Sequence, residues 1–314
     1  MTGHGPVEIT DVNNLAEIAI PQIAFDPRLE GQNLFRDVFG TKSMEEWTQT
    51  LIASIASRQI DGVEFPTFPP DEMQNRIHGH CGAHSIVEAG TFYKFACDHG
   101  LAGPTAPWYG KGYMLDFGAG WGRILRQFMR DFPLSQIIGF EPNARLCTVA
   151  RSNNPFVSFL SGDYLPTGIL PAQRFNLIVG WSIYSHLSEM SATAWLTETA
   201  RVLAPGGAAL YTTWGMRFLQ RLKREAELMQ AGQDIHWYSQ ICLRGAGDID
   251  QRIREYEAGE FVWFTQGQST LYGEAFVGRG ALERLIAREK LPLAVEVFDA
   301  TTLAQDAFVL RRVG

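Results

Sequence analysis

The sequence predicts an α/β protein built on a doubly wound, seven-stranded sheet. Two observations support this prediction: short apolar segments alternate with helical segments between residues 112 and 213, and a glycine-rich turn follows the first apolar segment. Alternation of this kind is typical of a mostly parallel sheet that is covered by helices on both faces. Two further apolar segments near the end of the chain complete the sheet.

The strands and helices are expected in strict alternation. Strands are predicted at 113–117, 136–140, 156–160, 175–181 and 208–213, with helices at 122–130, 144–152 and 192–203. A helix at 280–288 and strands at 293–298 and 307–310 follow. Only a short turn separates the last two strands, so we expect them to pair antiparallel. The final strand then runs against the rest of the sheet.

Two regions lie outside this alternation. Residues 1–110 predict an N-terminal helical cap or lid, in which Ser43 caps a helix that carries Trp47 and Leu51 at helical spacing. The linker around Gly110 separates the cap from a catalytic domain at 111–314. Residues 216–278 predict an insertion after the fifth strand, with a charged helix and an aromatic segment.

Composition narrows the class of protein. Of 314 residues, 46% are hydrophobic and 19% are charged, which is typical of a globular chain. The net charge of −7 argues against a nucleic-acid partner or an anionic membrane surface. The start at Met1 has no basic, apolar leader, and the four cysteines form no close pair, so we expect reduced thiols and a cytoplasmic location.

The glycine turn after the first strand predicts a small-molecule site. Gly118, Gly120 and Gly122 give a G-x-G-x-G spacing, whereas the dinucleotide fingerprint is G-x-G-x-x-G and would need a glycine where Arg123 stands. Asp116 precedes the turn by two residues. A carboxylate is unfavourable beside a pyrophosphate but favourable beside an ammonium group, so the ligand is expected to carry an amine.

Carboxylates follow two further strands of the predicted sheet. Glu141 ends the second strand, where a carboxylate can accept both hydroxyls of a ribose. Asp163 follows the third, where it can accept from an adenine amino group. A lone acid at such a position is as often a helix cap or a solvated loop residue. Three acids at three successive strand ends favour a nucleoside site.

These pieces together resemble a class I S-adenosylmethionine-dependent methyltransferase over residues 112–213. The resemblance implies a Rossmann-like sheet with an antiparallel last strand. It is carried by Leu115-Asp116-Phe117-Gly118-Ala119-Gly120-Trp121-Gly122-Arg123, Gly139-Phe140-Glu141-Pro142, Ser161-Gly162-Asp163, the segment 175–187 and Arg201-Val202-Leu203-Ala204-Pro205-Gly206-Gly207. Asn176 departs from the family pattern, which usually has an aspartate there.

The resemblance assigns the binding of S-adenosylmethionine to residues at the tips of four strands. They are Asp116, Gly118, Ala119, Gly120, Trp121, Glu141, Pro142, Asp163, Tyr164, Trp181 and Ser182. Within this set, Glu141 would hold the ribose hydroxyls, Asp163 would face the adenine amine and Asp116 would lie near the cofactor's amino group. Trp181 and Ser182 would sit beneath the sulfonium and the acceptor.

The candidate general base is His186, just past the fourth strand. Tyr184 and Arg123 are weaker catalytic candidates, and Arg123, on the first helix, is expected rather as an ion-pair or helix-surface residue. The alternative for His186 is a packed histidine that orders the following loop. Candidates for the acceptor site come from the cap and the insertion, each with core packing or a solvated surface as the alternative. They are Arg76, His80, Trp237, Tyr238 and Tyr272.

Two other patterns carry less weight. His78, His80, Cys81 and His84 fall within seven positions and could ligate zinc, but their spacing matches no standard finger, so no metal is predicted. The segment 180–184 has a tyrosine where a hydrolase nucleophile elbow needs its last glycine. A hydrolase is therefore not expected.

The sequence thus predicts an enzyme that transfers a methyl group from S-adenosylmethionine to an O or N atom of a small-molecule acceptor. Three alternatives stay open: an NAD-dependent oxidoreductase, a catalytically inactive binding subunit on the methyltransferase fold, and transfer of the cofactor's aminocarboxypropyl group. No nucleic-acid or membrane partner is expected, and a homodimer is one assembly that the sequence leaves open.

Overall fold

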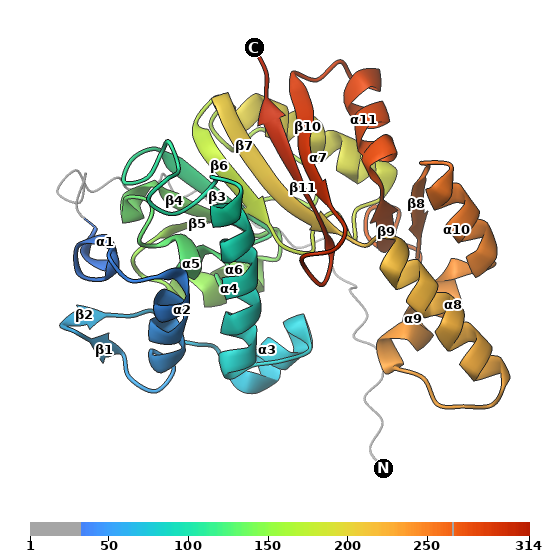
Figure 1. The fold of residues 1–314 in the computed structure, drawn as a ribbon, viewed down its shortest axis with the longest axis horizontal. Coiled ribbons are helices and arrows are strands. Elements are labelled where there is room, and N and C mark those ends of the chain that lie inside the picture. Colours follow the sequence, from blue (N-terminus) through green and yellow to red (C-terminus); the bar gives the residue numbers. More distant parts are fainter. Residues whose placement is uncertain (1–32, 266) are drawn as a thin grey trace.

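A computed structural model describes residues 33–265 and 267–314 of the chain. A seven-stranded sheet lies at its centre, with strand order β10-β11-β7-β6-β3-β4-β5 (Figure 1). Five strands run parallel, as the sequence predicted. These strands are β3 (Tyr113–Phe117), β4 (Ile137–Phe140), β5 (Ser158–Leu160), β6 (Phe175–Gly180) and β7 (Leu203–Thr213).

The last strand, β11 (Asp306–Arg312), lies between β7 and β10 (Leu293–Asp299) and runs antiparallel to both. This confirms the reversed final strand. Side chains alternate between the two faces of the sheet, so that Met114 and Leu177 enter one apolar cluster while Leu115 and Ile178 enter the other. Both faces are covered, and the strands are therefore apolar on both sides.

The helices α6 (Ala144–Asn153), α7 (Glu189–Val202) and α11 (Arg279–Arg288) match their predicted positions. The helix expected at 122–130 is reduced to α5 (Leu125–Phe128). Gly122 has a φ of +90°, which is outside the helical range, so a helix cannot begin there. The Asp116 carboxylate accepts a hydrogen bond from the Leu125 amide at 3.1 Å and provides the start instead.

The N-terminal region contributes a helical layer. Ser43 and Glu46 form the capping box that starts its second helix. Of the predicted cap, residues 1–32 lie outside the described residues. The elements of the layer are α1 (Leu34–Phe39), α2 (Met44–Ala53), β1 (Gln59–Ile60), β2 (Val63–Glu64), α3 (Asp71–His78) and α4 (Gly82–Asp98).

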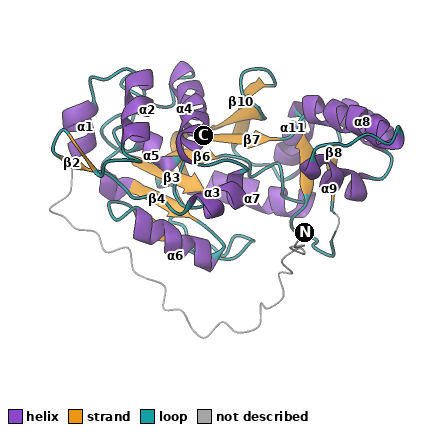
Figure 2. Cartoon of the chain, turned by 90° about the horizontal axis from the view of Figure 1, so that it is seen from below, coloured by secondary structure: helices purple, strands orange, loops and turns teal. Residues whose placement is uncertain are grey.

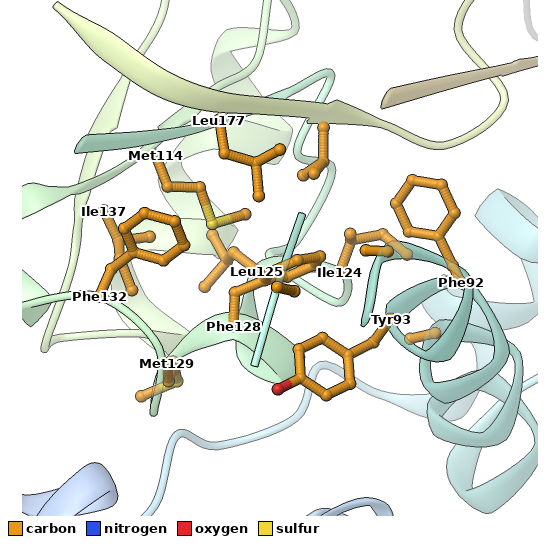
Figure 3. Packing of buried hydrophobic residues seen from close by; sticks show 14 of the residues in the cluster. Phe92, Tyr93, Met114, Ile124, Leu125, Phe128, Met129, Phe132, Ile137 and Leu177 are labelled. Carbon is orange, nitrogen blue, oxygen red and sulfur yellow. The ribbon is translucent and has the colours of Figure 1, made fainter. Parts of the chain in front are cut away.

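This layer shares one hydrophobic core with the sheet. Tyr93 of α4 packs edge-on against Phe128, with ring centroids 5.1 Å apart, and both lie below Met114 and Leu177 of the sheet in Figure 3. Buried hydrogen bonds add to the apolar contacts and join the layer to the segment around α5. The Nε1–H of Trp47 donates to the Gln127 carbonyl at 2.8 Å, and the Arg130 guanidinium donates to the Lys42 carbonyl at 2.7 Å. The predicted division at residue 110 therefore does not separate two hydrophobic cores.

The insertion after β7 has a small core of its own, in which Phe218, Leu222, Val262 and Phe276 are buried. It lies at the end of the molecule opposite α1 and α2 (Figure 2). Its elements are α8 (Met216–Gln230), α9 (Trp237–Ala246), α10 (Ile249–Glu257), β8 (Phe261–Phe264) and β9 (Glu274–Val277).

No helix in the described ranges combines the length and the apolar character needed to span a bilayer.

Candidate active site

The glycine turn lies at the carboxyl end of β3. Gly118 has a φ of +71° and Gly120 a φ of +57°, conformations that favour glycine. A Cβ on Gly118 would collide with the Ile183 side chain, whereas a Cβ on Gly120 would have no described atom within 4 Å. The backbone of the turn is therefore accessible over Gly120, where a ligand could approach closely.

Glu141, at the end of β4, is hydrogen-bonded to this turn. One carboxylate oxygen accepts from the Gly120 amide at 2.9 Å and the other from the Asn143 amide at 2.9 Å. Burial raises the pKa of Glu141, and these two amides oppose the rise. Each oxygen of a carboxylate has a second lone pair, so Glu141 can still accept from two hydroxyl groups. The ribose of an adenosyl group carries two neighbouring hydroxyl donors and therefore fits this carboxylate.

The other two acids differ from Glu141 in their surroundings. Asp116 is buried beneath the turn, and burial raises its pKa to about 7, with the Leu125 amide and Arg123 opposing the rise. Its carboxylate supports the turn rather than lining open space. Asp163 accepts from the amide of Tyr164 at 2.7 Å, and the Tyr164 ring is partly exposed. Pro142, between Glu141 and the cap of α6, is half-buried.

The N-terminal layer contacts the turn through Trp121. The indole N–H of Trp121 donates to Nε2 of His78 at 2.7 Å, so this nitrogen carries no proton. Burial, and then the charges of Arg123 and His80, lower the pKa of His78 to about 2. The side chain of Trp121 was predicted to bind the cofactor. It is instead buried against α3, because its N–H needs a partner there.

Arg123 is buried and forms an ion pair, which is one of the two structural roles that the sequence predicted for it. Its guanidinium donates to the Glu88 carboxylate at 2.7 Å and to the Ser85 carbonyl at 2.9 Å. Nε2 of His80 lies 3.4 Å from the same Glu88 carboxylate. The Glu88 carboxylate thus links α4 to the glycine turn.

Arg76 pairs with Glu72 on the exposed side of α3 and does not reach this cluster. His84 is exposed, and Cys81 precedes α4 as a free thiol. Within the described ranges, no group of three or more His, Cys, Asp or Glu side chains could hold a metal ion.

The end of β6 carries a strained backbone position. Ser182 has a φ of +59°, which is uncommon for a residue other than glycine and is often found at functional sites. Its amide donates to Oγ1 of Thr212 at 2.7 Å, and its hydroxyl accepts from the Gln305 amide at 2.7 Å. Trp181 packs edge-on against Phe92 at 5.3 Å between ring centroids. Thr212 and Gln305 had no motif that could have identified them in the sequence.

Tyr184 is not part of the site. Its side chain is fully buried between Tyr211 and Phe308, with ring centroids 4.8 and 5.2 Å away. Burial raises the pKa of its hydroxyl well above the usual value, so it is neither accessible nor ready to titrate. The turn after Ser182 directs this side chain into the core, and the catalytic prediction for Tyr184 is wrong.

His186 is brought together with the insertion. Its Nδ1 lies 2.9 Å from the Gly273 carbonyl, and its ring stacks on Tyr272 with centroids 4.8 Å apart and planes 13° apart. A carbonyl can only accept, so Nδ1 carries the proton and Nε2 keeps a free lone pair. The Gly273 amide donates back to the His186 carbonyl at 2.8 Å. This pairing holds the imidazole in one tautomer and one orientation.

Glu274 is the functional candidate that sequence reasoning missed. One of its carboxylate oxygens accepts from the Tyr238 hydroxyl at 2.8 Å and from the Trp214 indole at 3.1 Å, and lies 3.8 Å from Nδ1 of His186. Burial raises the pKa of Glu274, while His186, Tyr238 and Trp214 oppose the rise. Its place beside the predicted Tyr272 was the only signal in the sequence.

A cavity of about 160 Å³ adjoins this group of side chains. Tyr272 is half exposed at its rim, and the surrounding protein and the charges of Glu274 and Glu141 raise the pKa of its hydroxyl. The charge of Glu141, beside the glycine turn, and that of Glu274, in the insertion, therefore both act on the Tyr272 hydroxyl. Trp237, in contrast, is exposed on α9. The cavity is lined by Cys242, Phe264, Thr265, Gly267, Tyr272, Gly273 and Glu274.

Comparison with known proteins agrees with this geometry. Residues 114–207 match a family model described as a methyltransferase domain. A malonyl-[acyl-carrier protein] O-methyltransferase from Halalkalibacterium halodurans is 24% identical over 144 residues, which are 44% of this chain and 48% of the relative. An uncharacterized methyltransferase from Oceanobacillus iheyensis is 26% identical over 100 residues, or 31% of this chain and 45% of the relative. The chain spans about half the length of the curated relatives it matches.

Two solved structures are similar at lower identity. One is S-adenosylmethionine-bound CalS10, an amino pentose methyltransferase from Micromonospora echinaspora, with 16% identity, 78% of this chain and 98% of that chain covered, and a TM-score of 0.46. The other is an S-adenosylmethionine-dependent methyltransferase from Leishmania major, with 14% identity, 84% and 82% covered, and a TM-score of 0.47.

The family match covers the glycine turn and strands β3 to β6, and the sheet has the predicted parallel strands with β11 reversed. Residues 114–207 of the chain therefore match a methyltransferase domain, in keeping with the resemblance seen in the sequence.

Proposed function

We propose that this protein is an enzyme that transfers a methyl group from S-adenosylmethionine to an O or N atom of a small-molecule acceptor. The observation that supports this best is the position of Glu141, hydrogen-bonded to the open glycine turn at Gly120. On the other side of the site, Tyr272 stacks on His186, and the charge of Glu141 is among the causes that raise the pKa of its hydroxyl. The side of the site with Glu141 and Gly120, which we call the cofactor edge, then faces the side with His186, which we call the acceptor edge. Tyr272 lies at the boundary of the two.

Several residues would hold the cofactor. Glu141 would accept from the ribose hydroxyls, the backbone of the turn at Gly118 and Gly120 would approach the ligand closely, and Asp163 and Tyr164 would lie beside the adenine. When bound, S-adenosylmethionine supplies a methyl group on a sulfonium: the carbon–sulfur bond breaks as the bond to the acceptor forms, and an uncharged thioether leaves.

The protein's remaining work is to position the acceptor and to remove a proton. His186 is held with its Nδ1 proton on the Gly273 carbonyl, so Nε2 is the atom that takes the acceptor's proton. A positioned general base contributes about 10²–10⁴-fold to a rate when the acceptor must lose a proton. Alignment of the reacting atoms contributes more, up to about 7–11 kcal/mol.

The first test separates a methyltransferase from an NAD-dependent oxidoreductase. We expect S-adenosylhomocysteine to raise the melting temperature of the protein and NADH to leave it unchanged, since only a ligand that binds the native state stabilises it. The variant Glu141→Ala should weaken S-adenosylhomocysteine binding about tenfold or more in calorimetry, through the loss of charge-assisted hydrogen bonds. Glu283→Ala, on the exposed side of α11, is the control. An unchanged titration for Glu141→Ala would refute the ribose assignment.

The second test concerns His186. We expect His186→Ala to lose about 10²-fold in the rate of S-adenosylhomocysteine formation in a pool of small-molecule acceptors, with cofactor affinity retained. His84→Ala, an exposed histidine on α4, should behave as the wild type. Full activity of His186→Ala would exclude the base role. A protein that binds the cofactor but forms no product would be the inactive binding subunit, and a mass gain larger than a methyl group would indicate aminocarboxypropyl transfer.

A small-molecule acceptor is favoured because the cavity, which residues of the insertion line, has a volume of only about 160 Å³. A cytoplasmic location and a homodimer stay predictions from the sequence.

A further inference from the structure

Glu274 is a partly buried carboxylate, with 14% of its side chain exposed, and it has no permanently charged partner among the described residues. Its hydrogen-bond donors are the neutral groups of Tyr238 and Trp214. Within residues 33–265 and 267–314, no lysine or arginine forms an ion pair with it, and His186 at 3.8 Å is the one group that could supply a positive charge by taking up a proton. A buried charge is costly unless it is paired, so this carboxylate favours a ligand that brings a cation.

The cavity beside Glu274 has matching chemistry. Its lining holds one carboxylate, the aromatic rings of Phe264 and Tyr272, and no lysine or arginine. The charge of Arg221 influences the Cys242 thiol at one end of the cavity. The guanidinium of Arg221 is, however, already paired with the Glu225 carboxylate at 2.6 Å. Aromatic faces attract cations, whereas an anionic ligand would meet Glu274 without compensation.

We propose that the acceptor is a small amine, which Glu274 binds as its ammonium form and His186 deprotonates. This inference rests on the proposed function and names the acceptor class of that same site. The cavity volume corresponds to about five water molecules, so it encloses only the amine-bearing end of the acceptor.

The proton balance is consistent with the charges present. The ammonium nitrogen gives one proton to Nε2 of His186, and the lone pair left on nitrogen is the one that accepts the methyl group. Nδ1 of His186 stays protonated on the Gly273 carbonyl, so the imidazole becomes a cation 3.8 Å from Glu274. The methyl group carries the positive charge of the sulfonium to the nitrogen, so the product is a methylated ammonium ion, and the imidazolium returns its proton to solvent. Glu274 therefore has a cation beside it both before and after the transfer. A hydroxyl acceptor would leave Glu274 without a cation in the bound state.

The experiment compares three probes that differ in the charge of one group: benzylammonium, benzyl alcohol and benzoate. Each is titrated into the wild-type protein saturated with S-adenosylhomocysteine, with binding followed by ligand-observed NMR. We expect benzylammonium to bind about tenfold or more tightly than benzyl alcohol, and benzoate not to bind, because a charge-assisted contact is about twice as strong as a neutral one.

Two variants connect this preference to one residue. Glu274→Gln keeps the shape of the side chain and removes the charge, so it should lose the preference for benzylammonium over benzyl alcohol while its affinity for S-adenosylhomocysteine stays within about twofold of the wild type. Glu283→Gln removes an exposed carboxylate on α11 and should keep the preference. Tyr238→Phe removes one hydrogen-bond donor to Glu274 but keeps the charge of Glu274, so it should keep the preference for benzylammonium. It provides a second measurement if Glu274→Gln fails to fold.

Each outcome decides the question. Equal binding of benzylammonium and benzyl alcohol to the wild type, no binding of benzylammonium, or an unchanged preference in Glu274→Gln overturns the amine assignment. A loss in Glu274→Gln that affects S-adenosylmethionine and not S-adenosylhomocysteine overturns it too, because the cation at Glu274 would then be the sulfonium. Failure of the wild type to bind S-adenosylhomocysteine refutes the proposed function itself, and is measured separately.

Discussion

The N-terminal layer and the insertion cover the same sheet in different ways. Residues 33–110 enter the core of the sheet, so that Trp47 and Phe128 belong to one apolar cluster. Residues 216–278 fold around a separate small cluster centred on Phe218 and Phe276. The first region is part of the body that supports the glycine turn, whereas the second contributes side chains to the acceptor edge. We infer that cofactor binding depends on the stability of the whole domain and acceptor binding on that of the insertion.

The two regions also differ in their polar contacts with the site: the N-terminal layer uses side chains, and the insertion largely uses its backbone. Side chains of the N-terminal layer reach the turn through Arg123 and Glu88, which are buried or half-buried. The insertion reaches the site largely through backbone pairing, in which the Gly273 amide donates to the His186 carbonyl and the Ala275 amide to the Ser185 carbonyl. Backbone pairing of this kind tolerates different side chains, so the acceptor edge is the part of the fold that is free to vary in sequence.

The largest expected effect is that of Trp47→Ala. Trp47 is fully buried and its indole N–H donates to the Gln127 carbonyl, so the variant leaves a cavity and an unpaired carbonyl. The free energy of unfolding should fall by about 3–5 kcal/mol, and cofactor binding should be lost at the same urea concentration as the fold. Urea unfolding followed by tryptophan fluorescence and far-UV circular dichroism measures this. A change below about 1 kcal/mol would show that the layer is not part of the main core.

A second prediction uses Asp131, which ties the same layer to the sheet and whose pKa burial raises to about 6. The unfolded carboxyl ionises from about pH 4, so the stability that protonated Asp131 contributes is present at low pH and is lost as the pH rises toward about 6. Asparagine does not titrate. The unfolding free energy of Asp131→Asn relative to wild type should therefore rise by roughly 3 kcal/mol across this window.

Urea titrations at the two ends of the window measure this difference. Glu283→Gln, an exposed carboxylate, is the control and should show little pH-dependent change relative to wild type. A flat difference for Asp131→Asn would mean that the pKa of this carboxyl is the same in the folded and the unfolded protein.

The smallest effect on the main body is expected from Phe218→Ala, which removes a ring from the separate core of the insertion. The unfolding transition of the sheet should move by about 1 kcal/mol or less, while the insertion loosens locally. S-adenosylhomocysteine affinity should stay unchanged, and the preference for benzylammonium should be lost. Hydrogen exchange followed by mass spectrometry would locate the loosening. Loss of cofactor binding in this variant would contradict the division between the two regions.

Much of the sheet could be predicted because its signals are local. Buried parallel strands are short apolar runs, and the turn at Gly118 and Gly120 needs glycine at positive φ, so both are visible in the sequence. The helix after the turn was overextended, because the φ of +90° at Gly122 depends on its packing against Asn154 and Phe159, which are distant in sequence. Tyr184 was misassigned for a similar reason, since only packing decides which way a side chain points after a strained turn.

The sequence by itself determined the α/β alternation, the reversed last strand and the glycine turn with Glu141 at the neighbouring strand end, since each depends on residues close together in the chain. The tertiary structure decided the acceptor edge. His186 and Glu274 are separated by almost ninety positions, and they meet only because residues 271–275 pair with the loop after β6. Contacts of this kind are selected by the burial of whole elements, and they leave no periodic pattern in the sequence.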